Sequence, residues 1–150
     1  MESEILHLAH ALQNTFEKNA WHGPAVKEVL ADITPQQAHH RLPATHSIIE
    51  LVAHMTAWRT FVTHRLQGDT DYKVSDEQNF PTLSDWNIVV RNLEESQAAL
   101  LQALLQFPQQ RLDEKISPGE YNYTFYTLLS GIIHHDLYHL GQIVLLKKTI

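Results

Sequence analysis

Residues 124–148, TFYTLLSGIIHHDLYHLGQIVLLKK, decide the fold of this chain because their pattern predicts one long amphipathic helix. The inward stripe recurs at alternating spacings of four and three residues, the period of a helix that packs against other helices. Two closing lysines suit the negative end of a helix dipole. The stripe consists of Leu128, Ile132, His135, His139, Gln142 and Leu146.

Three more stretches upstream have the same helical periodicity. A capping box of Ser47 and Glu50 marks the start of one of them, and Gly68 follows its end. Because almost no strand signal is present, we predict an all-α protein, an antiparallel four-helix bundle with short connecting helices and one long loop. Pro118-Gly119 predicts a turn or small hairpin. The expected long helices cover residues 2–18, 47–66, 84–107 and 124–148, and the long polar connection covers residues 69–82.

Composition places the chain among ordinary globular proteins. It has 150 residues, of which 43% are hydrophobic and 19% charged, and this fits a single domain over residues 1–150. No stretch approaches the ~20 apolar residues of a membrane span, and the first residues lack a secretory signal, so we expect a cytoplasmic protein. The formal charge of -6 and the scattered basic residues argue against a nucleic-acid partner. Since the chain has no cysteine, thiol chemistry would need a thiol from outside it.

Three histidines in the middle of predicted helices form the candidate metal site. His135 and His139 are four residues apart, so their imidazoles share a helix face and can both reach an ion at ~2.0–2.1 Å. His54 lies at mid-length on the inward stripe of another helix. One histidine on an apolar face is more often a core residue, but three at matching depth are hard to satisfy without a metal or a polar partner. We therefore predict one divalent metal ion per chain on three protein ligands, the number typical of catalytic sites.

Other polar residues near these histidines are candidates for supporting or catalytic roles. Asp136, Tyr138 and Gln142 accompany the ligands on the last helix, and their ordinary alternatives are a solvated charge, a packed ring and a polar residue of the stripe. Glu50 lies one turn before His54; it would serve first as a capping carboxylate, and otherwise as a fourth ligand or an acceptor beside the ligands. The sequence leaves open the roles of Glu50, His22 and His134.

The same histidines predict a pH dependence of metal binding. Imidazole must be neutral to bind a metal, and its unperturbed pKa is about 6.5. From the sequence alone, the affinity for the ion is therefore expected to fall as the pH drops through about 6.

Four motifs carry a resemblance to a known family. They are WHGP at residues 21–24, HSIIELVAH at residues 46–54, AWR at residues 57–59 and GIIHHDLYHLGQI at residues 131–143. With these motifs the chain resembles the DinB-like superfamily over nearly its whole length, and within it the branch of YfiT-like metal-dependent hydrolases and thiol transferases. The resemblance implies a four-helix bundle, a nickel, zinc or iron ion, and often a homodimer. The metal ligands that it implies correspond to His54, His135 and His139.

The function expected from this site is a metal-dependent enzyme that activates a thiol or a water for transfer or hydrolysis. A bound cation lowers the pKa of its ligand, so that a thiol or water would ionise near neutral pH. The segment from His135 to His139 is also similar to the H-E-x-x-H motif of zinc hydrolases, but Asp136 replaces the glutamate and is one methylene shorter. The substrate would be a small molecule, and a low-molecular-weight thiol is one candidate. From a different class, the chain could be a non-catalytic metal-binding module for stress response or sensing.

Overall fold

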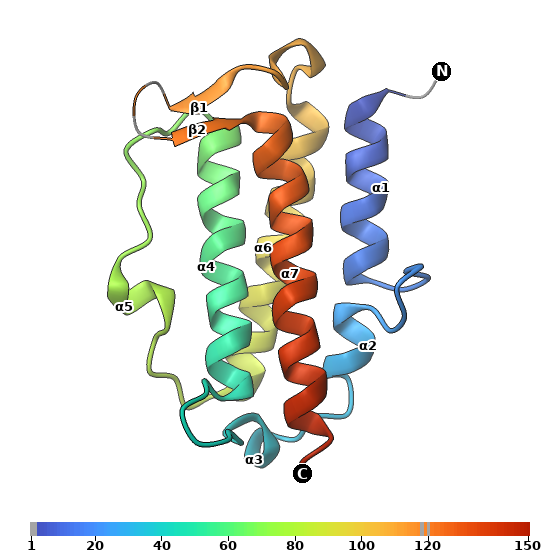
Figure 1. The fold of residues 1–150 in the computed structure, drawn as a ribbon, viewed down its shortest axis with the longest axis vertical. Helices are drawn as coiled ribbons and strands as arrows, with labels where there is room; N and C mark the ends of the chain where they lie inside the picture. The colour runs from blue at the N-terminus through green and yellow to red at the C-terminus, as the bar shows by residue number, and fades with distance from the viewer. Residues whose placement is uncertain (1–2, 118, 120) are drawn as a thin grey trace.

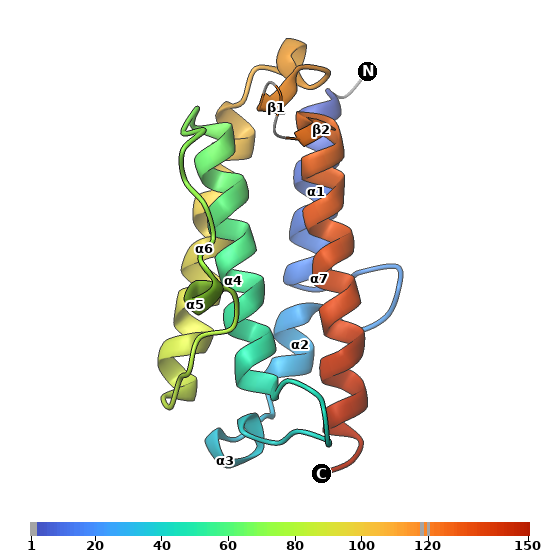
Figure 2. The ribbon, with the colours of Figure 1, turned by 60° about the vertical axis from the view of Figure 1, so that its left-hand side comes forward.

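The computed structural model describes residues 3–117, 119 and 121–150, and most of them are helical. The long helices are α1 (Glu4–Phe16), α4 (Ile48–Leu66), α6 (Trp86–Gln106) and α7 (Phe125–Lys147). They lie alongside one another, with α4 and α1 each in contact with both α6 and α7 (Figure 1, Figure 2). The predicted all-α class is confirmed. Within the described ranges, no helix is both long and apolar enough to cross a bilayer.

Short elements connect these helices. Strands β1 (Lys115–Ser117) and β2 (Tyr121–Thr124) form an antiparallel hairpin, in agreement with the turn or small hairpin predicted for this part of the sequence. In the expected turn, Gly119 has a φ of 89°, which favours glycine, whereas Pro118 lies outside the described residues. The short helices are α2 (Val26–Leu30), α3 (Pro35–Ala38), α5 (Asp76–Asn79) and the 3-10 helix η1 (Gln109–Arg111).

The observed ends of the helices differ from the expected ones by at most two residues, and α4 ends at Leu66 as expected. α1 begins at Glu4, and the expected start at residue 2 lies outside the described residues. α6 begins two residues later than expected because the Asp85 carboxylate caps it by accepting hydrogen bonds from two backbone N–H groups of its first turn. The predicted capping box is present: the Ser47 backbone N–H donates to Glu50 Oε2 at 2.7 Å.

The directions of the helices differ from simple up-and-down alternation. α1 and α7 run opposite to α4 and α6, but α4 and α6 run in the same direction (Figure 1). This is possible because the connection of residues 67–85, which contains α5, returns along the outside of α4 (Figure 2). Extended chain covers up to ~3.3–3.6 Å per residue, against ~1.5 Å per residue for a helix, so the connection is long enough to do this. The expected long loop is therefore observed.

The hydrophobic core is divided into two clusters along the helix axes. On α4, buried apolar residues within 48–55 belong to the first cluster and those within 61–66 to the second. On α7, the first cluster takes residues within 140–146 and the second takes residues within 125–132. The buried side chains between the two clusters are polar: Arg59 on α4, and Asp136 and His139 on α7.

Buried polar side chains link the four long helices in this middle layer. Arg59 Nη2 contacts Asp136 Oδ2 at 2.7 Å, and both side chains are fully buried. Arg59 Nε donates to Gln97 Oε1 at 3.2 Å, and Gln97 Nε2 donates to the Leu12 carbonyl at 3.4 Å. The guanidinium also lies 4.8 Å from the centroid of the Phe16 ring. One arginine thus connects α4 with α7, α6 and α1.

Burial and charge act in opposite directions on this pair. Burial raises the pKa of Asp136 to about 6, while the neighbouring guanidinium lowers it. Burial likewise lowers the pKa of Arg59, and the carboxylate opposes that change. Arginine nevertheless stays protonated in proteins, so removal of the carboxylate would leave a buried positive charge without a counter-ion.

The buried pair predicts an asymmetric response to mutation. Asp136→Asn should lower the free energy of unfolding of the metal-free protein by about 3–5 kcal/mol, because Arg59 keeps its charge and loses its counter-ion. The double variant Arg59→Met/Asp136→Leu should lose less than this, since no buried charge remains. Urea denaturation measures both values. A double variant that loses as much stability as Asp136→Asn, or more, would contradict this account.

Candidate metal centre

The three predicted histidines meet between α4 and α7. His54 Nε2 lies 3.0 Å from His135 Nε2, and His139 Nε2 lies 3.2 Å from the same atom. The possible ligand atoms of all three side chains lie within 4.8 Å of one another. Helical spacing explains this arrangement, because the four-residue separation of His135 and His139 places both on the face of α7 that contacts α4.

Hydrogen bonds to oxygen atoms set the tautomers of two of these histidines. His54 Nδ1 lies 2.8 Å from the carbonyl oxygen of Asn79, which can only accept, so this nitrogen carries the proton. His139 Nδ1 donates in the same way to Gln142 Oε1 at 2.7 Å. In each neutral imidazole, Nε2 then carries a lone pair that points into the cluster. This is the tautomer that binds a metal through Nε2.

His135 differs from the other two. Its Nε2 faces two lone pairs, so in the metal-free protein its proton belongs on Nε2, where it can be shared with His54 and His139. Its Nδ1 is buried without a hydrogen-bond partner among the described protein atoms. A cation in the cluster would take the place of this proton on Nε2, and the neutral ring would then carry its proton on Nδ1.

The electrostatic environment keeps the three histidines neutral. Burial lowers the pKa of His54 and of His139. The pKa of His135 falls to about 3, first through burial and then through repulsion from protonated forms of the neighbouring histidines and from Arg59. All three imidazoles are therefore in their metal-binding charge state at neutral pH.

The donor set fits a divalent metal ion. Two nitrogens each ~2.05 Å from an ion at a tetrahedral angle would be about 3.3 Å apart. The observed separations of 3.0 and 3.2 Å are close to this value. Within the part of the chain that the structure describes, no carboxylate joins the cluster. Three imidazoles would thus leave one position of a tetrahedral ion for another ligand.

The connection between α4 and α6 covers one side of the cluster. Besides the Asn79 carbonyl, it supplies the Phe80 ring, which stacks on His54 with centroids 4.2 Å apart. On its other face, the Phe80 ring stacks on the His46 ring, with centroids 3.6 Å apart. The Trp58 indole N–H donates to Asn79 Oδ1 at 3.1 Å and so ties the connection to α4. The sequence analysis missed Asn79 and Phe80, because the polar loop contains two aromatic residues, Tyr72 and Phe80, and nothing in the sequence shows which of them reaches the histidines.

The three secondary candidates on α7 lie in different surroundings. Gln142 contacts the cluster directly through its bond to His139. Asp136 is not a solvated charge, because it is fully buried against Arg59, which the sequence analysis named only as part of the AWR motif and gave no role. The Tyr138 ring lies edge-on to His139 with centroids 5.0 Å apart, but the side chain is 67% exposed and is therefore not a ring packed in a helix contact.

The residues whose roles were left open do not join the cluster. Glu50 Oε2 accepts from Ser47 and lies 3.1 Å from Arg41 Nη2, so it serves as the capping carboxylate. His22 and His134 are exposed.

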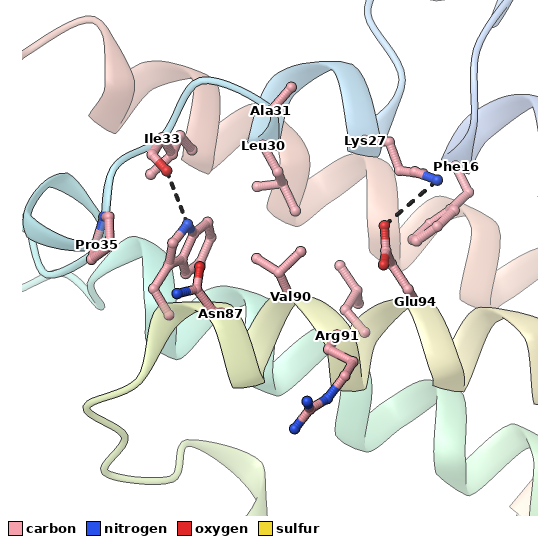
Figure 3. A pocket seen from close by; sticks show the side chains of 12 residues that line it. Phe16, Lys27, Leu30, Ala31, Ile33, Pro35, Asn87, Val90, Arg91 and Glu94 are labelled. Carbon is pink, nitrogen blue, oxygen red and sulfur yellow. Dashed lines mark hydrogen bonds and ion pairs between the residues drawn. The ribbon is translucent and has the colours of Figure 1, made fainter.

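Two cavities have to be compared as possible substrate sites. One, of about 390 Å³, is apolar and has His135 in its wall. The other, of about 420 Å³, lies between α6 and the segment from α2 to Pro35, and the ion pair of Lys27 with Glu94 borders it (Figure 3). No histidine lines this larger cavity, so its size alone does not connect it with the metal centre.

Comparison with known proteins identifies the family. The family model of the DinB superfamily matches residues 18–143, a range that includes all three histidines of the cluster. The chain belongs to the DinB superfamily. Among curated proteins and among solved structures, no match is found.

The geometry predicts which substitutions abolish metal binding. His54→Ala, His135→Ala and His139→Ala should each lose the ion, whereas Gln142→Leu should weaken binding by roughly 10–100-fold through loss of the orienting hydrogen bond. His64→Ala is the matched control, because His64 is also on α4 but pairs with Asp69 outside the cluster. Elemental analysis of protein purified without a histidine tag measures occupancy. A fully occupied His135→Ala protein would disprove the assignment.

The lowered pKa values change the pH dependence expected from the sequence. Three unperturbed imidazoles would lose roughly 50-fold in metal affinity between pH 7.5 and pH 6.0. Since the pKa of each histidine in the folded protein lies below its ordinary value, protons should compete only at more acidic pH. We expect less than a tenfold loss over this interval and release at lower pH. Equilibrium dialysis with a zinc buffer gives the affinity. A roughly 50-fold loss of zinc affinity by pH 6.0 would contradict the lowered pKa values of the three histidines.

Proposed function

We propose that this protein is a metal-dependent enzyme that activates a thiol or a water for transfer or hydrolysis of a small molecule. One nickel, zinc or iron ion per chain would be held by His54, His135 and His139 in the middle of a four-helix bundle in which α1 and α7 run opposite to α4 and α6. The observation that carries the proposal is the convergence of three Nε2 atoms, two of them with their tautomers set by hydrogen bonds to oxygen.

The number of ligands supports a catalytic role over a purely structural one. Structural zinc sites are normally closed by four protein ligands, whereas catalytic sites keep one position open. A divalent ion at this site would supply Lewis acidity, lowering the pKa of a thiol or water that binds it. Because the chain has no cysteine, the thiol would be a separate low-molecular-weight molecule.

Residues around the cluster have distinct tasks in this proposal. Asn79 and Gln142 hold the imidazoles of His54 and His139 in orientation, and Phe80 excludes water from one face. Asp136 acts as a positioning residue, because its pairing with Arg59 fixes the segment of α7 that carries both of its ligands. Tyr138, beside His139 but mostly exposed, would contact a substrate only if the substrate approaches along the outer face of α7.

A non-catalytic role is the second candidate. An ion on His54, His135 and His139 would join α4 to α7, and two of these histidines are buried. Metal binding would then stabilise the fold or report metal availability, as in a stress-response or sensing module. An exchangeable fourth position distinguishes the enzyme from this alternative.

The cellular setting of the proposal follows from charge and surface. The net charge of -6 disfavours nucleic acid, so the proposed partners are small molecules. The proposed location is the cytoplasm. A homodimer is also proposed, and the exposed Leu145 on α7 offers apolar surface for a second copy.

Cobalt substitution tests the proposed open position. Adding 2-mercaptoethanol to cobalt-loaded protein should produce a sulfur-to-cobalt charge-transfer band in the near ultraviolet, because a cation favours the deprotonated thiol. His139→Ala, which loses a ligand, should show no band. The thiol should then react with an epoxide or activated halide faster in the presence of protein than alone at the same pH. If the cobalt ion has exchangeable water but millimolar 2-mercaptoethanol produces no charge-transfer band, thiol transfer is excluded and hydrolysis is favoured.

A further inference from the structure

The apolar cavity beside the histidine cluster is placed to select the substrate. α4 contributes Trp58 and Phe61 to its wall, the β1–β2 hairpin contributes Ile116, and α7 contributes Gly131 and His135. We propose that this cavity binds an uncharged apolar group of the thiol or its acceptor, roughly the size of one or two aromatic rings. The inference rests on the proposed function, because it names the class of substrate for the same site.

The cavity meets the metal centre at His135. His54 and His139 are 6% and 7% exposed, while His135 is only partly buried and forms part of the cavity wall. The Trp58 ring connects the two regions, since its centroid lies 6.1 Å from that of His135 and 5.3 Å from that of Phe61. A group in the cavity would therefore lie next to a reactive atom held at the histidines.

The lining of the cavity selects against charge. Among the described residues that line it, none is an aspartate, glutamate, lysine or arginine. Its side-chain hydroxyls come from Tyr123 and Thr127, and the Trp58 indole N–H is already bonded to Asn79. A charged group would lose hydration here without gaining a counter-ion from the described part of the lining, whereas an apolar group is transferred favourably from water.

Gly131 provides a direct way to fill the cavity. It lies in α7 one turn before His135, and a Cβ built on it would meet no atom within 4 Å. A leucine there would extend into open space, and leucine favours a helix more than glycine does, so Gly131→Leu should fold. Gly141 has the same open surroundings in the same helix but does not line the cavity. Gly141→Leu is therefore the matched control.

Two probes separate the cavity from the metal centre. Cobalt-loaded protein is titrated with benzyl mercaptan and with 2-mercaptoethanol, two thiols of similar acidity. Zinc-loaded protein is titrated with 4-fluorotoluene, which has no metal-binding group, and followed by ¹⁹F NMR. We expect benzyl mercaptan to bind at least tenfold more tightly than 2-mercaptoethanol, and 4-fluorotoluene to give a saturable shift. Gly131→Leu should abolish both effects and leave 2-mercaptoethanol binding within twofold, while Gly141→Leu should match the original protein.

The outcomes distinguish the two proposals. Equal affinity for the two thiols, with no saturable 4-fluorotoluene shift, would overturn the cavity proposal and leave thiol activation intact. If neither thiol gives a band, thiol activation fails, and the 4-fluorotoluene titration alone decides the cavity. Should Gly131→Leu fail to fold or to bind metal, Thr127→Leu at an exposed position of the same wall takes its place. Binding of 4-fluorotoluene that is unchanged in a folded blocking variant would also overturn the proposal.

Discussion

The buried contact between Arg59 and Asp136 is the constraint on which the metal centre depends. α4 and α7 run in opposite directions, so stepping back from Arg59 to His54 moves along the bundle in the same sense as stepping forward from Asp136 to His139. The pair thus sets the register at which three imidazoles reach the same level. A buried ion pair contributes little net stability, but one arrangement of the helices satisfies it far better than a shifted one.

The three histidines share one cluster but have unequal surroundings. His54 and His139 are buried and bonded to oxygen through Nδ1, so their orientation is fixed before any ion binds. His135 has no partner for Nδ1 and faces the apolar cavity. His54 and His139 therefore account for the geometry of the site, and His135 connects the site to the cavity where a ligand can enter.

The sequence was sufficient to predict the helices and the histidine cluster because both follow from periodicity. Inward positions recur at fixed spacing, and His54, His135 and His139 occupy them at mid-helix. Periodicity does not predict which charged residues are buried. Asp136 comes one position after an inward residue, and a charged side chain at such a position usually faces solvent. Its burial becomes evident only when Arg59, far away in the sequence, is seen to lie against it.

The contribution of the loop was beyond sequence reasoning for a different reason. Asn79 contacts His54 through its backbone carbonyl, a group that every residue possesses, so residue type carries no signal. The parallel course of α4 and α6 was also unexpected, because the length of residues 67–85 permits either direction. Where a long connection lies is decided by packing across the whole molecule.

The same connection has a consequence for the rate at which an ion could enter or leave. None of residues 69–85 is fully buried, and a segment without fully buried residues is expected to open at a lower free energy than the long helices unfold. When it opens, His54 loses both the Asn79 carbonyl and the stacked Phe80 ring. The Asn79 carbonyl orients His54 as Gln142 orients His139, so opening of this segment would affect both the equilibrium affinity for an ion and the rate of its exchange.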